Sequence, residues 1–403
     1  MSDITRTRPN ADQMDRLIDG VSAVTSAILS QTSRPDTWQQ VQLAVNLGTA
    51  KKMLPIGDQI LDKWTKAAGG TEQVVAWDVM HHYENGDMAL SWHYAFPDAI
   101  QFDAPEALFY APAGGLAAGQ YYVEIKASYG TGWVVGECIN FTLTDAMAEG
   151  DQFFVDCGTN NANNPTDGRA WRTYAKGSTT VKLSGTTSNS TDGTKFGETD
   201  ANAHKTNGNI NAASRVVYGS GRWSQSAVRQ WLNSAAAAGS WWTAQNEWDR
   251  PPSQATTLRG FLAGFSEDFL SVLDPVPVVT ALNTQEGFAE TTETTMDRIF
   301  LPSLQEMYVT PQLADVEGVD WDYNKILAQE TGLSGKFAQY GTYEILRKYN
   351  LENKSSPVHV WLRSCGRSHA YSAWNVGNTG NVSTYAAYGT YRGCPACKIR
   401  KLA

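Results

Sequence analysis

The chain has 403 residues, a net charge of −9, 35 glycines, 14 tryptophans and 17 tyrosines. This length predicts two or three domains, and the many Gly, Tyr and Trp residues favour a β-rich protein with long loops. The acidic balance disfavours a nucleic-acid partner, and no apolar run reaches the roughly 18 residues that would predict a membrane-spanning helix.

The first 50 residues are predicted to be helical. Residues 10–31 carry apolar side chains at spacings of three and four behind a cap at Asn10, and this stripe covers about two heptads. We interpret it as an oligomerisation or attachment contact, and a helix packed on its own domain is the alternative. Pro35 and Asp36 begin a second predicted helix, which Gly48 ends.

Residues 51–156 are predicted to form an antiparallel β-sandwich, because short apolar runs of period two alternate with turn signals. The expected strands cover 73–80, 88–95, 107–111, 120–126, 132–143 and 152–156. One clear turn signal is the Asn-Gly pair between Glu84 and Asp87.

Three histidines in this range could be drawn as a metal cluster together with Glu84 and Asp87. Neighbouring residues of a strand point to opposite faces, however, so His81 and His82 are not expected to bind one ion with His93. We therefore expect no metal and no cofactor here.

The five cysteines are expected to be structural thiols. Cys138 and Cys157 lie singly in β-like runs, whereas Cys394 and Cys397 have the spacing of a redox or half-zinc motif without a second pair. Residues three apart in a strand face opposite sides, which disfavours chelation by both thiols. The odd cysteine count and the absence of a signal-peptide core predict synthesis in a reducing cytoplasm.

Residues 157–403 are predicted to form a further domain. Strands are expected at 169–175, 178–184, 277–282 and 299–303, with helices capped by Ser224 and Ser266 and a short helix at 304–308. The acidic stretch from Asp315 to Asp322 could hold calcium. It lacks the spacing of a calcium loop, and a solvated surface is the preferred interpretation.

The sequence shows no catalytic motif. It contains no phosphate loop, zinc-protease motif or nucleophile elbow, and none of the six histidines has a Ser or Cys partner at motif spacing. His359 is expected to be a core histidine with satisfied hydrogen bonds. The sequence therefore predicts a protein that is not an enzyme.

The most distinctive stretch runs from Gly366 to Tyr391. It contains no Lys, Glu, Gln, Met or Asp and consists mainly of Gly, Ser, Thr, Asn, Tyr and Ala around Trp374, Val376 and Val382. Short hydroxyl and amide side chains mixed with tyrosines are typical of adaptable recognition surfaces. A solvated pair of loops is the alternative interpretation.

The missing residue types also indicate a mutational origin. If the adenines of AAC codons were randomised, the third base would stay C, and Lys, Glu, Gln, Met and Trp could not arise. Every polar position of the stretch obeys this restriction, and the single Trp occupies an apolar anchor position. Asp, Phe, Ile and Leu could arise from such codons but are absent.

Four groups of residues resemble a known family. They are 222–233, 248–252 with the Phe-rich run 261–270, 299–306, and 361–376. In this order they resemble the DUF6273-type C-type-lectin-like domain of variable proteins in diversity-generating retroelements, notably those of gut bacteriophages. Residues 100–144 resemble the β-domain that accompanies it. The resemblance covers residues 51–403, and the first 50 residues match no family.

The resemblance implies a phage virion protein for host attachment, carried on a tail or head fibre and commonly trimeric. Its partner would be a bacterial cell-surface receptor, protein or glycan, while the N-terminal segment would contact other virion proteins. A lectin-like scaffold, including Trp374, Val376, Val382 and residues 361–363, would carry a face diversified by adenine mutagenesis. The implied diversified, ligand-binding positions are Gly366, Ser368, His369, Tyr371, Ser372, Asn375, Gly377, Asn378, Asn381, Ser383, Thr384, Tyr385, Tyr388, Gly389 and Tyr391. The run Gly393-Cys394-Pro395 departs from the usual family ending, which leaves the end of the variable region open.

Two other functions stay open at this point. One is a structural virion protein that decorates or caps an assembly, with the C-terminal ribbon buried against another subunit. The other is an enzyme related to the formylglycine-generating fold, for which only Cys394 and Cys397 could supply thiols. Solvent exposure of Tyr371, Tyr385 and Tyr388 distinguishes receptor binding from capping.

Overall fold

The computed structural model describes residues 34–124, 138–143, 145–156, 172–175, 181–182, 191, 193–196, 215 and 218–402. It is a mixed α+β structure with few helices and many antiparallel strands in small sheets. The helix predicted over 10–31 and the thiol of Cys157 lie outside the described residues. Within the described residues, every helix is too short or too polar to cross a membrane.

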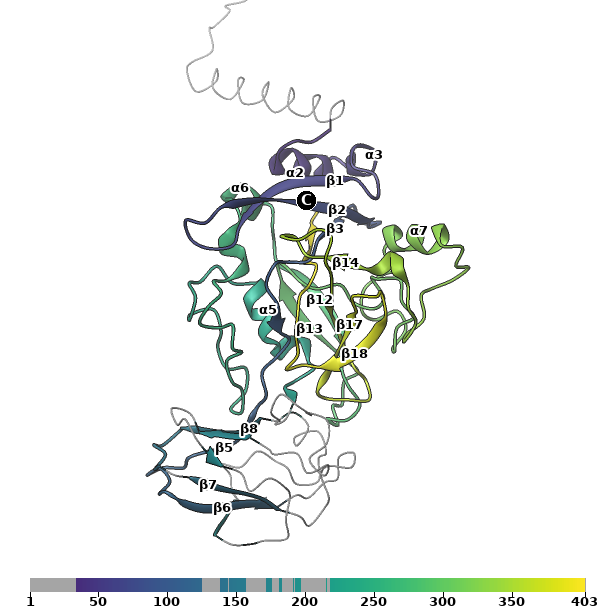
Figure 1. Ribbon diagram of the computed structural model, residues 1–403. Coiled ribbons are helices and arrows are strands. Elements are labelled where there is room, and N and C mark those ends of the chain that lie inside the picture. Colours follow the sequence, from purple (N-terminus) through teal and green to yellow (C-terminus); the bar gives the residue numbers. More distant parts are fainter. Residues whose placement is uncertain are drawn as a thin grey trace, which may run out of the picture.

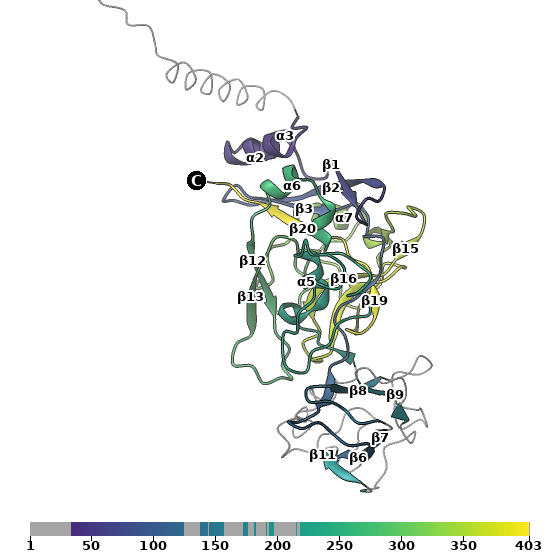
Figure 2. The same ribbon diagram turned by 90° about the vertical axis from the view of Figure 1, so that its left-hand side faces the viewer.

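The largest sheet of the core joins the two ends of the chain. It contains β1 (Gln59–Thr65), β2 (Glu72–His82), β3 (Met88–Trp92) and β20 (Ala396–Ile399), in the order β1-β2-β3-β20. Figure 2 shows the C-terminal strand beside the N-terminal ones. The predicted second helix is confirmed as α2 (Trp38–Asn46), which begins after the N-cap Thr37 and is followed by α3 (Ala50–Met53).

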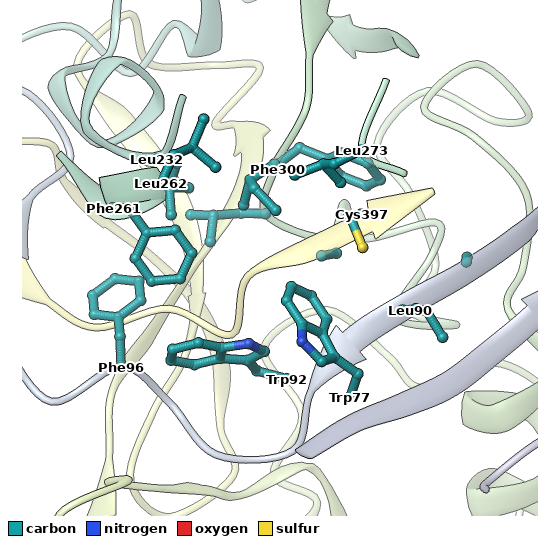
Figure 3. Packing of buried hydrophobic residues seen from close by; sticks show 14 of the residues in the cluster. Trp77, Leu90, Trp92, Phe96, Leu232, Phe261, Leu262, Leu273, Phe300 and Cys397 are labelled. Atoms are coloured by element: carbon teal, nitrogen blue, oxygen red, sulfur yellow. The ribbon is translucent and has the colours of Figure 1, made fainter. Parts of the chain in front are cut away.

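Aromatic side chains from distant parts of the chain fill this core (Figure 3). The rings of Trp77 and Trp92 are 5.9 Å apart, Phe261 lies 5.1 Å from Trp92, and Trp38 of α2 lies 4.6 Å from Phe269. Each fully buried ring stabilises the fold by about 1.5–3 kcal/mol. The core is made of residues from the ranges 38–102 and 223–399, so residues on both sides of position 50 contribute to it.

The strands expected to form one sandwich over 51–156 are divided between two parts of the molecule. Strands β1 to β3 and β4 (Ile100–Gln101) belong to the core. A separate inserted lobe follows, comprising the described residues between 107 and 196 (Figure 1). Its strands are β5 (Ala107–Tyr110), β6 (Gly119–Glu124), β7 (Cys138–Leu143), β8 (Gln152–Asp156), β9 (Arg172–Ala175), β10 (Val181–Lys182) and β11 (Thr194–Phe196).

The lobe has two sheets, ordered β10-β9-β8-β5 and β11-β6-β7, and only the β11–β6 pair of the described strand pairs is parallel. Pairing across the lobe therefore uses residues on both sides of the expected 156/157 boundary, because β8 pairs with β9.

The remaining elements surround the core. They are η2 (Trp223–Gln225), α5 (Ala227–Leu232), η3 (Phe261–Gly264), α6 (Glu267–Ser271), β12 (Val276–Ala281), β13 (Thr292–Asp297), α7 (Asp322–Glu330), η4 (Glu344–Leu346), β14 (Lys348–Tyr349), β15 (Pro357–Val358), β16 (Val360–Cys365), β17 (Ser372–Val376), β18 (Val382–Ala386) and β19 (Thr390–Tyr391).

Local capping explains two of the helices. Ser266 caps α6 by accepting a hydrogen bond from Phe269 N, as predicted. The prediction for α5 placed its cap two residues early, because Ser226 rather than Ser224 accepts the hydrogen bond from Arg229 N.

Two predicted elements are absent. Residues 299–303 form one isolated bridge, Phe300 with Ala396, instead of a strand, because the backbone N–H of Ser303 donates to the Glu306 carboxylate and not to a neighbouring strand. Residues 304–308 form turns instead of a helix, and this segment ends at Tyr308, whose φ is 57°.

Candidate recognition face

The C-terminal ribbon is an antiparallel sheet of β16, β17 and β18, with β17 in the centre. Opposed residues of neighbouring strands share a face, so the register Trp374↔Thr384 places these two side chains on one face. The register Ala373↔Tyr385 and Asn375↔Ser383 defines the other face. The predicted positions on β17 and β18 are therefore divided between two faces.

The face that carries Trp374 is mostly buried in the protein interior. Trp374, Val376 and Val382 are all 0 % exposed and pack in one apolar cluster with Val360 and Leu362 of β16. The indole N–H of Trp374 donates to Gln312 Oε1 at 3.0 Å. These three side chains are therefore part of the hydrophobic core.

The opposite face opens toward its β18 edge and continues into a run of aromatic rings. The ring centroid of Tyr218 lies 4.8 Å from that of Tyr371 and 5.8 Å from that of Tyr388. Tyr388 in turn lies 6.5 Å from Tyr385, which lies 5.1 Å from Tyr391. His369 extends one end, 5.3 Å from Tyr371. We call these six residues the tyrosine face: Tyr218, His369, Tyr371, Tyr385, Tyr388 and Tyr391.

The tyrosine face rests on the core at its other end. The ring of Tyr391 lies 4.6 Å from that of the fully buried Trp361 and stacks on His359 at 4.7 Å with an interplanar angle of 20°. Tyr385 is 43 % exposed, whereas Tyr371, Tyr388 and Tyr391 are half-buried. The face thus combines one exposed tyrosine with supporting rings that are partly covered by their neighbours.

The tyrosine face carries little charge. Arg367 is the only charged residue between positions 366 and 391, and its guanidinium donates to the backbone oxygen of Leu282 at 3.2 Å. Burial raises the pKa of Tyr391, and the neighbouring hydroxyl of Tyr385 raises it further. At neutral pH the Tyr391 hydroxyl therefore stays protonated and able to donate a hydrogen bond.

The other predicted positions at the surface lie around this face. Ser368 is exposed beside the half-buried His369, and the Ser368 hydroxyl lies 3.2 Å from His369 Nδ1. Asn378 is exposed at the turn between β17 and β18, and Asn381 is half-buried at the end of that turn. Ser383 shares the face of Tyr385, whereas the half-buried Thr384 lies on the face of Trp374.

The remaining predicted positions are buried: Gly366, Ser372, Asn375, Gly377 and Gly389. Asn375 donates its amide to the backbone oxygen of Ser383 at 3.0 Å, inside the sheet. Among the described residues, the hydroxyl of Ser372 has no hydrogen-bond partner. A ligand does not reach these side chains without a rearrangement of the ribbon.

The three buried glycines each contact another predicted position. A Cβ on Gly366 would lie 2.2 Å from Ser372 Oγ, one on Gly377 2.0 Å from Asn381 Oδ1, and one on Gly389 2.7 Å from the Tyr385 ring. Two non-bonded heavy atoms cannot approach this closely, so a larger residue at any of the three requires its neighbour to move or to change. These positions are thus coupled in pairs.

Two residues that the sequence did not indicate belong to the tyrosine face or support it: Tyr218 is a member, and His359 stacks on Tyr391. Tyr218, 5 % exposed, lies outside the ribbon in sequence, and nothing in its local pattern distinguishes it. His359 was expected to be a satisfied core histidine, but its Nδ1 has no hydrogen-bond partner among the described residues and its ring is half-buried. Burial lowers the pKa of His359, and an interaction with the Asn375 side chain only partly opposes this effect.

The other residues considered as sites are dispersed. His81 Nδ1 lies 2.9 Å from Asp322, His82 Nε2 lies 2.9 Å from the Leu54 carbonyl oxygen, and His93 Nδ1 lies 2.9 Å from Asp78. The part of the chain that the structure describes holds no group of three or more metal-binding side chains.

The acidic stretch is not a uniformly solvated surface, which corrects the prediction. Glu317 is 2 % exposed and accepts hydrogen bonds from Ala281 N and the Ser364 hydroxyl, at 3.0 and 2.7 Å. The Glu317 carboxylate therefore links Ala281 of β12 to Ser364 of β16. The sequence pattern could not indicate this because the two donors come from distant strands.

Cys394 and Cys397 are free and buried. Cys394, which precedes β20, packs in the cluster of Trp374, and Cys397 within β20 packs in the core around Trp77, so the two thiols lie in different clusters. Burial raises the pKa of the Cys394 thiol to about 11. A buried thiol that stays protonated at neutral pH is a poor nucleophile, which is consistent with a structural role.

Comparison with known proteins identifies one family. The chain matches the model of a domain of unknown function, DUF6273, over residues 184–401, which contain α5, α6, the whole ribbon and β20. No curated protein and no solved structure matches the chain. Because the matched range covers more than half of the sequence, the protein belongs to the DUF6273 family.

Proposed function

We propose that this protein is a phage receptor-binding protein, not an enzyme, and that it attaches virions to host cells through the tyrosine face. The observation that carries the proposal is the continuous aromatic run, in which all but one of the residues come from predicted ligand-binding positions. Tyrosines offer large contact area with few rotatable bonds and a hydroxyl for hydrogen bonding, which suits recognition.

The electrostatics favour a partner that is recognised without strong charge pairing. The face has neutral tyrosines, short hydroxyls and amides, and the guanidinium of Arg367 is bonded to Leu282 O. Such a surface gives modest affinity per copy. Several copies on one particle would raise the overall avidity by about a hundredfold or more through effective concentration.

Diversification of the face by a retroelement is part of the proposal. It is supported by the residue types of positions 366–391 and by the burial of Trp374, Val376 and Val382 between the predicted variable positions. Under the proposal, a lectin-like scaffold keeps these anchors constant. Buried variable positions such as Gly377 would then act by reshaping the ribbon, and exposed ones such as Tyr385 by touching the receptor.

Sequencing of codons 366–391 across many particles from one lysate tests the diversification. We expect changes confined to adenines of the predicted codons, with Trp374, Val376 and Val382 constant. A ribbon that is identical in all particles, or changes spread equally over the anchor codons, would contradict the diversification.

Labelling of intact particles separates receptor binding from capping. Tyr385→Cys introduces a thiol at an exposed position, while the cysteines in the described part of the chain are buried. We expect a maleimide to label this variant on native particles as fast as Tyr340→Cys, a control at a 66 % exposed position whose ring packs against Trp374, on the opposite face. Unmodified particles give the background. Protection of position 385 alone would favour a ribbon buried against another subunit, and absence of the protein from purified particles would exclude both functions.

A further inference from the structure

The chain crosses twice between the core and the inserted lobe, and the two crossings touch. The outgoing crossing is residues 103–107, and the returning one comprises Arg215 and residues 218–221. Glu106 N donates to Arg215 O at 3.1 Å, and Ser220 N donates to Asp103 Oδ2 at 3.0 Å. Gly219 has a φ of 75°, and a Cβ there would lie 2.7 Å from Ala104 O. The crossings are therefore packed backbone against backbone.

A cluster of buried charges surrounds this junction. The Arg215 guanidinium pairs with Glu106 and Glu286 and donates to Gln225 Oε1 at 2.6 Å. Asp103 and Asp249 are 1 % and 2 % exposed, and Asp249 accepts hydrogen bonds from the backbone N–H groups of Gln245 and Arg250. Arg250 reaches the same region, where it donates to Pro105 O at 3.3 Å. The carboxylates of Asp103, Glu106, Asp249 and Glu286 thus lie around this junction, and Arg215 pairs with Glu106 and Glu286.

Asp103 has an unusual bonding pattern in this cluster. One of its oxygens accepts from Ser220 N, and the other has no hydrogen-bond partner among the described residues. In such a place an ionised carboxylate with an unpartnered oxygen costs more free energy than the neutral carboxylic acid does.

The titration of the cluster agrees with this bonding. Burial raises the pKa of Asp103 well above its ordinary value, and the charges of Asp249 and Glu106 raise it further. Burial likewise raises the pKa of Asp249, to about 6. Burial and the neighbouring charges therefore favour the neutral form of Asp103.

The segment that Asp103 holds leads directly to the tyrosine face. The carbonyl oxygen of Tyr218 accepts a hydrogen bond from Tyr388 N at 2.9 Å, and Gly221 N donates to Ala370 O at 2.8 Å. A Cβ on Gly221 would lie 2.2 Å from Ser372 O, so only glycine allows this approach to β17. Residues 218–221 are consequently enclosed between Asp103 on one side and the ribbon on the other.

We propose that Asp103, in its neutral form, is a positioning residue of the tyrosine face: it holds residues 218–221 against the ribbon and thereby sets the ring of Tyr218 between Tyr371 and Tyr388. The meaning of this role for ligand binding rests on the proposed function above, but the geometry and its test require no ligand. When the junction carboxylates ionise, their mutual repulsion loosens the returning crossing and with it the support of Tyr388.

Hydrogen exchange at the amides of Ser220, Gly221 and Tyr388, measured on the full chain at pH 5 and pH 8 and corrected for the intrinsic rate, tests the proposal. We expect part of the wild-type protection at these amides to be lost between pH 5 and pH 8, because the higher pH favours ionisation of the junction carboxylates. Asp103→Asn keeps an acceptor for Ser220 N without the charge, and its protection should fall less between the two pH values than that of the wild type, because only the remaining carboxylates such as Asp249 still titrate. Asp103→Leu removes the acceptor and should lose the protection at both.

The matched control is Asp62→Asn, which neutralises a half-buried carboxyl of β1 whose pKa burial also raises. It should leave the pH dependence at Ser220 unchanged. An Asp103→Asn profile that falls with pH as the wild type does would overturn the proposal, as would full protection in Asp103→Leu. If Asp103→Leu does not fold, the comparison between wild type and Asp103→Asn decides alone. If the hydrogen-exchange results are as expected but the protein does not bind a receptor, the proposed function is contradicted and the positioning role of Asp103 is not.

Discussion

The two faces of the C-terminal sheet differ in what their side chains do. On one face, Trp374, Val376 and Val382 are completely buried in an apolar cluster. On the other face, burial decreases from Trp361 on β16 to the 43 % exposed Tyr385 on β18. Because side chains alternate along a strand, one short strand serves both the core and the surface. Substitutions at alternate positions should therefore have very different consequences.

The largest effect is expected for Trp374→Ala. Removal of a fully buried indole that also donates to Gln312 should lower the free energy of unfolding by about 3–5 kcal/mol. Urea denaturation followed by circular dichroism measures this loss. A loss below about 1 kcal/mol, the range of an average substitution, would show that the two faces are not energetically distinct.

A smaller effect is expected for Gly377→Ala, because its Cβ would lie 2.0 Å from Asn381 Oδ1. The clash should cost about 1–2 kcal/mol. In the double variant with Asn381→Ala, the cost should largely disappear, which gives a coupling energy of about 1 kcal/mol. Gly335→Ala, where no atom lies within 4 Å of the added Cβ, is the control and should cost little. If the changes in the free energy of unfolding caused by Gly377→Ala and Asn381→Ala are additive in the double variant, the two positions are not coupled.

The ionisation of Tyr391 tests the hydroxyl contacts within the tyrosine face. Its pKa is raised in the folded protein, so the unfolded chain ionises first and the stability from this group is lost as the pH rises above about 10, the ordinary value for tyrosine. Absorbance at the tyrosinate band should show a late-titrating phase that also contains Tyr83 and Tyr323, whose pKa values burial raises as well, and Tyr391→Phe identifies the part that comes from Tyr391. Tyr385→Phe removes the neighbouring hydroxyl and should lower the pKa of Tyr391. An unchanged titration of Tyr391 in this variant would show that the Tyr385 hydroxyl does not interact with it.

The smallest effect on stability is expected for Tyr385→Ala. Most of the ring's surroundings are solvent or other surface rings, so the free energy of unfolding should change by about 1 kcal/mol or less. Attachment of particles to their host cells should nevertheless decrease, whereas Tyr340→Ala on the opposite side should attach normally. Equal attachment of both variants, with normal folding, would remove Tyr385 from the recognition face.

Much of the secondary structure could be predicted from local patterns. The alternating apolar runs predicted β2, β3 and β12, and the serine before a short apolar run predicted α6 with its cap. Strand β1 was missed because Leu61 on its outer face is 67 % exposed while Asp62 points inward, which hides the usual alternation. Alternation of apolar residues does not predict a strand where the exposure of its side chains depends on packing against residues that are distant in sequence.

The sequence by itself determined the family, through the order of its motifs and the family match over residues 184–401. It also determined the residue types of the ribbon and the buried anchors between them, because these depend on composition and on a period of two along each strand. Only the tertiary structure decided which ribbon positions are accessible and which residues support them. The pairing of β3 with β20 and the stacking of Tyr218 between Tyr371 and Tyr388 both join residues far apart in the chain. Such contacts arise from the packing of the whole core, and local sequence carries no record of them.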